Sequence, residues 1–143
     1  FADALGGIVD APMGWLGLAA PANTEVSDLA TEAFVGAWWL LPIALVSSLF
    51  NYLLGEELLW RGVLLPKMRG TFGRWDWLAN ALLFTFYHLH KPWTWPSSFI
   101  GNALIAYPTR RFRSIWLAVI IHGIEGVVLL LLVTGVVLGI GID

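Results

Sequence analysis

Long apolar runs separated by short polar and glycine-rich connections cover the chain from residue 33 to its C-terminal end. A helix of about 20 apolar residues crosses the hydrocarbon core of a bilayer. The pattern therefore predicts an all-α fold, a multi-pass transmembrane helical bundle. Its spans, about four in number, are expected at about residues 36–66, 76–91, 97–109 and 114–139, of which the third is short.

The first apolar run can be interpreted in two ways, because it meets a glycine and two acidic residues halfway along. One interpretation ends the span at Gly55, and the other continues one long helix to Pro66. Three bases lie in residues 67–74, three more in residues 110–113, and only Lys91 lies in the connection between them. If the basic connections are cytoplasmic, the long helix places the acidic N-terminal part outside, as the positive-inside rule prefers.

The N-terminal part of the chain has a different composition. Residues 1–32 contain no Lys or Arg, five acidic residues and several glycines and prolines, so they do not resemble the n-region of a secretory signal. We expect an irregular or interfacial segment over residues 1–32 and a transmembrane helical domain over residues 33–143. The chain begins with Phe1 rather than Met, which predicts a processed, truncated or partly observed chain.

Composition strengthens the membrane prediction. Hydrophobic residues make up 58% of the chain and charged residues 13%, whereas soluble domains average about 45–50% and about 25%. The net charge of −2 and the absence of an extended basic face argue against nucleic-acid binding, and the lack of cysteine excludes disulfides and thiolate metal sites. Membrane lipid is the expected environment, with a bacterial inner membrane favoured.

Ionisable residues inside the predicted spans are the candidates for chemistry, because they are costly there. Glu57 and Arg61 have the i,i+4 spacing of a helical ion pair, with the acid first, which predicts a structural role. Glu56 points about 100° away on the same helix and is a candidate general base for a water molecule. A polar clamp between helices with no chemistry explains the same residues on spacing alone.

Two histidines lie in other predicted spans. His88 follows Phe84 by one turn, and His122 precedes Glu125 by three residues. At the helical rise, Glu56, His88 and His122 lie roughly 16, 18 and 12 Å from the cytoplasmic ends of their spans, so we expect them to meet at a similar depth. Each histidine taken alone is more often structural.

Taken together, these motifs resemble a known family. The run Glu56-Glu57-x-x-x-Arg61, the pair Phe84-x-x-x-His88 and the later His122 are similar to the motifs of the CAAX protease and bacteriocin-processing family, over about residues 47–127. Its members include the type II CAAX prenyl endopeptidases. The resemblance implies intramembrane hydrolysis of peptide bonds by an activated water, without a metal, a cofactor or a covalent intermediate. The implied substrate is a hydrophobic or lipidated peptide.

The resemblance also implies a role for each matching residue. Glu56 corresponds to the glutamate that activates the water, and His88 to the histidine that works with it. Glu57 and Arg61 correspond to a supporting ion pair. His122 corresponds to the histidine near the developing oxyanion.

One position departs from the family pattern. Proteolytic members carry an Asn four residues after the last histidine, where this chain has Gly126. A lost oxyanion donor costs about 10²–10³ in kcat. Asn102 or Glu125 are the residues that could replace it.

Two alternatives follow from these residues. Gly126 favours a family member with weak or no activity, acting as a binding or assembly subunit among the other subunits of a membrane complex. A metal site built from Glu56, His88, His122 and Glu125 ranks last, because the chain contains no His-Glu-x-x-His motif.

Overall fold

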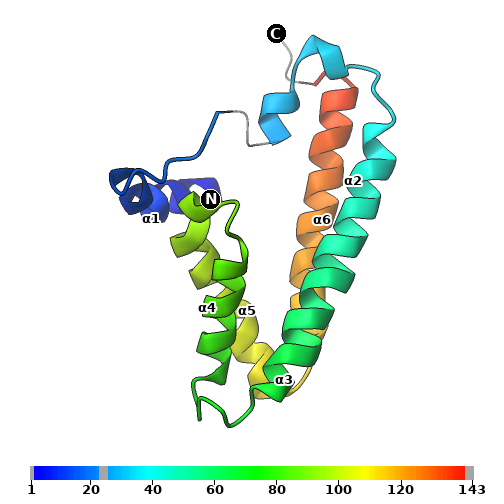
Figure 1. The fold of residues 1–143 in the computed structure, drawn as a ribbon. Coiled ribbons are helices and arrows are strands. Elements are labelled where there is room, and N and C mark those ends of the chain that lie inside the picture. Colours follow the sequence, from blue (N-terminus) through cyan, green and yellow to red (C-terminus); the bar gives the residue numbers. More distant parts are fainter. Residues whose placement is uncertain (1, 23–25, 141–143) are drawn as a thin grey trace. The chain divides into compact units, whose positions relative to one another are not determined.

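The computed structural model describes residues 2–22 and 26–140, which form helices and connections and contain no strand (Figure 1). The all-α prediction is therefore confirmed. The elements in chain order are α1 (Ala2–Trp15), η1 (Val26–Leu29), η2 (Glu32–Phe34), α2 (Leu40–Ser48), η3 (Leu49–Leu64), α3 (Leu65–Lys67), α4 (Asp76–Tyr87), η4 (Pro92–Thr94), α5 (Trp95–Phe112) and α6 (Trp116–Val137). Three of the short elements, η1, η2 and η4, are 3₁₀-helices, whereas η3 is a π-helix.

Helical backbone runs without a break from Leu40 to Lys67, through α2, η3 and α3. This continuity confirms the prediction of one long helix and excludes a helix end at Gly55. The predicted second span, 76–91, ends earlier, because α4 stops at Tyr87. The third is longer than predicted, since α5 covers Trp95–Phe112.

One helix among the described residues, α6, has the length and apolar composition that crossing a membrane requires. Its bounds, Trp116–Val137, lie within the predicted fourth span. The number of spans stays a prediction.

The chain divides into two compact units. Unit 1 comprises Phe1–Pro21 and Leu59–Ala118, and unit 2 comprises Ala22–Leu58 and Val119–Asp143. The boundaries between the units fall inside η3 and near the start of α6, so each of these two helices contributes residues to both units. The predicted domain boundary after residue 32 stays a prediction.

In unit 1, α4 and α5 lie side by side (Figure 1). Their core contains Leu65, Ala81 and Ala106, and the two alanines have no solvent exposure. Small residues at a helix interface let two backbones approach closely. Three partly buried hydrophobic side chains pack against this core: Trp77, Phe99 and Ala103.

The N-terminal helix α1 corrects one prediction. An irregular segment was expected here, but Ala2–Trp15 is helical despite Pro12. Local propensity does not reveal the tertiary contacts of this helix: Oδ1 of Asp10 accepts a hydrogen bond from the backbone N–H of Ser97 at 2.8 Å, and Oδ2 accepts one from its hydroxyl at 2.6 Å. Asp10 thereby binds a backbone N–H in the first turn of α5. An interfacial position for this segment stays a prediction.

In unit 2, α2 and α6 pack through Ala44, Val133 and Val137 (Figure 1). The C-terminal end of α6 is closed by a Schellman motif, in which the N–H of Gly139 donates to the carbonyl of Val136 and the N–H of Ile140 donates to that of Gly135. Gly139 has a φ of +73°, a conformation that favours glycine.

Candidate active site

A short contact between predicted site residues joins η3 to α6 within unit 2. Nδ1 of His122 lies 2.7 Å from Oε1 of Glu57, and the Glu57 side chain is fully buried. At this distance the buried carboxylate and the ring form an ion pair when His122 is protonated, and the contact holds the ring beside Glu57. The sequence predicted both residues as site residues but paired Glu57 with Arg61, and it did not reveal this contact.

Glu125 lies on the other side of the same imidazole ring. Its Oε2 is 3.6 Å from Nε2 of His122, one turn back along α6, and its side chain is 56% exposed. His122 therefore lies between one buried and one accessible carboxylate. Gly126, which follows Glu125, is buried and adds no hydrogen-bonding side chain to this face of α6.

Glu56 lies in the π-helical segment η3, next to Glu57, and is partly buried. The preceding residue, Gly55, is exposed but lies close to the backbone of its own helix: a Cβ there would lie 2.7 Å from the carbonyl oxygen of Phe50. A π-helix has one more residue in each hydrogen-bonded loop than an α-helix, and short π-helical turns within α-helices are frequent at functional sites. The absence of a side chain at Gly55 therefore permits the backbone path that carries both glutamates.

In unit 1, the guanidinium of Arg61 is fully buried between α4 and α5. Its Nη2 donates to Oδ1 of Asn102 at 2.5 Å, and its Cζ lies 4.3 Å from the centroid of the Phe84 ring. A planar guanidinium can bind an amide oxygen and stack on an aromatic face at the same time. Three predicted supporting residues thus meet, and the amide oxygen of Asn102 binds Arg61. The predicted pair of Glu57 with Arg61 stays a prediction.

His88 is the C-cap of α4 rather than a residue within the helix. Its Nδ1 lies 3.0 Å from the carbonyl oxygen of Phe84, one of the carbonyls that a helix end leaves without an intrahelical partner. The indole N–H of Trp95 donates to the backbone carbonyl of His88 at 3.1 Å. The ring is therefore oriented by α4, and the proton on Nδ1 leaves Nε2 as the basic nitrogen.

Sequence reasoning missed two buried residues that support this side. The ring of Trp60 lies 5.0 Å from that of Phe84 and 5.6 Å from that of Tyr87. The amide of Asn80 donates to the backbone carbonyl of Trp60 at 3.1 Å. Asn80 is a polar residue within an apolar stretch of α4, and that isolation is the signal that could have identified it.

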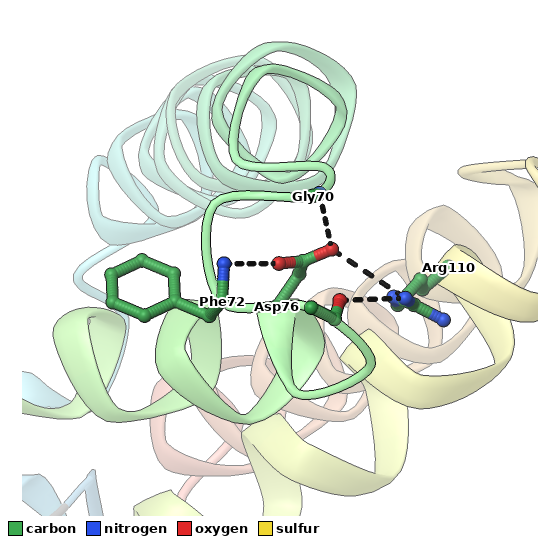
Figure 2. A network of polar contacts seen from close by, with 5 residues as sticks. Gly70, Phe72, Asp76 and Arg110 are labelled. Carbon is green, nitrogen blue, oxygen red and sulfur yellow. Dashed lines mark hydrogen bonds and ion pairs between the residues drawn. The ribbon is translucent and has the colours of Figure 1, made fainter.

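Asp76 fixes the N-terminal end of α4 in unit 1 (Figure 2). Its buried carboxylate accepts hydrogen bonds from the backbone N–H groups of Gly70 and Phe72, each at 2.9 Å, and lies 3.5 Å from Nη2 of Arg110. Arg110 also donates to the carbonyl of Gly73 at 3.0 Å. These contacts hold the connection between α3 and α4 against the end of α5.

The same contacts set the charge of Asp76, which lies where this connection meets α4. The hydrogen bond from Gly70 is the largest influence, and with that from Phe72 and the Arg110 guanidinium it holds the pKa of the carboxyl below its ordinary value, while burial acts in the opposite direction. The signal that could have identified this residue is an acid at a helix start after a glycine-rich connection.

The predicted site residues therefore form two groups. Unit 2 contains Glu56 and the cluster of Glu57, His122 and Glu125. Unit 1 contains the cluster in which Phe84 contacts both Arg61 and His88, together with Asn102. The convergence of Glu56, His88 and His122 stays a prediction. Within the described ranges, no three His, Cys, Asp or Glu side chains are gathered closely enough to hold a metal ion, so the alternative of a four-residue metal site finds no support.

Comparison with protein families identifies one match. The family model described as type II CAAX prenyl endopeptidase Rce1-like matches residues 37–128, which include every predicted site residue. No curated protein and no solved structure matches the chain significantly.

Proposed function

Because the chain belongs to the type II CAAX prenyl endopeptidase Rce1-like family, we propose that it is an intramembrane endopeptidase that hydrolyses hydrophobic or lipidated peptides with an activated water. The observation that carries the proposal is the buried contact of 2.7 Å between Glu57 and His122, beside Glu56 in sequence. An oriented imidazole next to a second carboxylate is the arrangement that general acid–base hydrolysis requires.

In the proposed reaction, Glu56 and Nε2 of His88 share one water molecule. The water oxygen attacks the carbonyl carbon of the scissile bond while its proton passes to the glutamate. The carbon–nitrogen bond then breaks, and the amine leaves with that proton. No metal or covalent enzyme intermediate takes part in these steps.

His122 is proposed to stabilise the tetrahedral oxygen. The contact of Glu57 with Nδ1 holds the ring, and the proton on Nε2 of the imidazolium is the proposed donor to the developing charge, on the side of Glu125. With Gly126 in place of an asparagine, His122 supplies the side-chain donor from this turn of α6. We therefore expect a slower enzyme than one with both donors.

The proposed enzyme is embedded in a membrane, with about four spans and cytoplasmic basic connections. The apolar face of α6 supports this placement, since Ile120, Ile124 and Leu131 are each more than half exposed. Contact of such a face with lipid avoids the cost of exposing it to water.

The test uses the purified full chain with a prenylated or hydrophobic peptide. Replacing Glu56→Gln removes the proposed base while keeping the shape of the side chain, and it should abolish cleavage. Glu32→Gln removes the same charge in η2, outside the site, and should cleave like the unchanged protein. Retained cleavage by the Glu56→Gln variant would contradict the proposal.

A second function is favoured by Gly126. The chain would then be a family member that has lost activity and acts as a subunit in the assembly of a membrane complex. In that case the unchanged protein and the Glu56→Gln variant are equally inert, and the chain purifies in fixed stoichiometry with other subunits. Cleavage by the unchanged protein, with none by the Glu56→Gln variant, contradicts this function.

A further inference from the structure

An apolar groove lies between α4 and α5 in unit 1, outside both groups of site residues. Its volume is about 420 Å³, and six side chains line it: Trp77, Phe99, Ile100, Ala103, Leu104 and Tyr107. The α5 residues recur at helical spacing and extend for roughly 12 Å along that helix. The volume lies in the range of about 300–1,000 Å³ that is typical of small-molecule sites.

One end of the groove is aromatic and basic. The rings of Trp77 and Tyr107 meet edge to face there, with centroids 5.2 Å apart. Arg111 follows Tyr107 by one turn on the same face of α5 and is exposed. Such a combination of Trp, Tyr and Arg is typical of the level of lipid headgroups.

The structure brings a second set of bases to this end. Arg110 bonds to both the carbonyl of Gly73 and the carboxylate of Asp76, so the connection before α4 lies against the end of α5 (Figure 2). Residues 67–76 and 110–113 together contain six bases and one acid. The bases are Lys67, Arg69, Arg74, Arg110, Arg111 and Arg113.

We propose that the groove binds one acyl chain of an anionic phospholipid, whose phosphate lies at this basic end. The apolar lining favours a hydrocarbon guest because the guest removes apolar surface from water. The excess of positive charge at one end selects an anionic headgroup. No residue of the proposed catalytic site lines the groove, so the proposal stands or fails independently of the protease activity.

The test measures lipid binding to the detergent-purified full chain by native mass spectrometry and by the thermal unfolding midpoint. Phosphatidylglycerol should bind one per chain and raise the midpoint, whereas phosphatidylcholine with the same acyl chains should bind more weakly. Arg111→Gln should weaken phosphatidylglycerol binding by about fivefold, the effect of one base near an anionic lipid. Lys91→Gln changes the net charge equally in the connection between α4 and α5, and should leave binding unchanged.

The groove itself is tested by filling it. Leu104→Trp should abolish tight binding of phosphatidylglycerol, while Leu131→Trp on exposed α6 should retain it. Helix content and elution volume identify a variant that fails to fold, in which case the smaller change Ala103→Leu replaces Leu104→Trp and should also weaken binding.

Several results would overturn the proposal. Equal affinity for the two phospholipids would show that the anionic headgroup is not recognised. Full competition by soluble glycerol phosphate would show that the acyl chain does not contribute to binding. Displacement of the phospholipid by a farnesylated cysteine at equal concentration would assign the groove to a prenyl group instead.

Discussion

At the scale of single residues, the buried charge of Asp76 is stabilised by several hydrogen-bonding and ionic partners. The Asp76 carboxylate accepts two backbone hydrogen bonds and contacts Arg110. Hydrogen bonds to a charged acceptor are stronger than those between neutral groups. One carboxylate therefore holds the glycine-containing connection and two helix ends together.

The lowered pKa of Asp76 predicts a pH dependence of stability. The folded state stabilises the ionised form of this carboxyl more than the unfolded state does. The contribution of Asp76 to the free energy of unfolding is therefore complete above the ordinary carboxyl pKa of 3.8, and it is lost as the pH falls through the lower pKa of the folded state. Asp76→Asn should lower the unfolding midpoint at pH 7. The difference from the unchanged protein should shrink below about pH 4, and a difference independent of pH would contradict this origin.

The pairing of Glu57 shows how far single residues can be predicted from the sequence. The i,i+4 spacing predicts Arg61 as a partner because helical neighbours are visible locally. His122 lies in a helix distant along the chain, and only packing of η3 against α6 brings its ring to the carboxylate. The sequence offers both residues as candidates, whereas the contact between them depends on tertiary structure.

At the scale of elements, the long helix from Leu40 to Lys67 was predictable from its apolar run, but its π-helical register in η3 was not. Hydrophobic spacing does not distinguish one helical register from another within a run that is apolar on most sides. The end of α4 at Tyr87 was also missed, because the apolar pattern does not reveal the contacts at that end, from the His88 ring to the Phe84 carbonyl and from the Trp95 indole to the His88 carbonyl.

The short distance from Gly55 to the carbonyl of Phe50 predicts that a glycine-to-alanine substitution there lowers the stability rather than raising it. Glycine to alanine inside a helix stabilises a protein by about 0.5–1 kcal/mol where space allows. Gly101→Ala in α5 meets no atom within 4 Å and should show this gain. Gly55→Ala should instead destabilise by about 1–3 kcal/mol, because its Cβ meets a backbone oxygen. Denaturant unfolding of both variants measures the difference, and a gain at Gly55 would contradict the observed register.

The contact of Asp10 with Ser97 predicts how α1 is retained. Asp10→Ala removes two hydrogen bonds to a carboxylate, worth about 1.5–3 kcal/mol each. Amide hydrogen exchange should therefore rise throughout Ala2–Trp15 and stay unchanged in α4. Ser98→Ala, next to the contact, should exchange like the unchanged protein. Equal exchange in the Asp10→Ala variant would mean that apolar packing alone holds α1.

At the scale of the whole molecule, the two basic connections are related by direct contact. Arg110 binds the connection between α3 and α4, so residues 68–75 and the end of α5 lie on the same side of unit 1. This arrangement requires α4 and α5 to run in opposite directions. The positive-inside rule predicts that this side is cytoplasmic and that the connection around Leu89 lies on the other side.

The absence of native cysteine makes this arrangement directly testable. Single cysteines at the exposed positions Phe72, Phe112 and Leu89 can be labelled with a membrane-impermeant maleimide in vesicles of known orientation. Phe72→Cys and Phe112→Cys should react only from the cytoplasmic side, and Leu89→Cys only from the opposite side. Labelling of all three from one side would contradict a crossing by α4 and α5. If Phe72→Cys and Phe112→Cys reacted from opposite sides, the contact of Arg110 with Asp76 could not exist in the membrane.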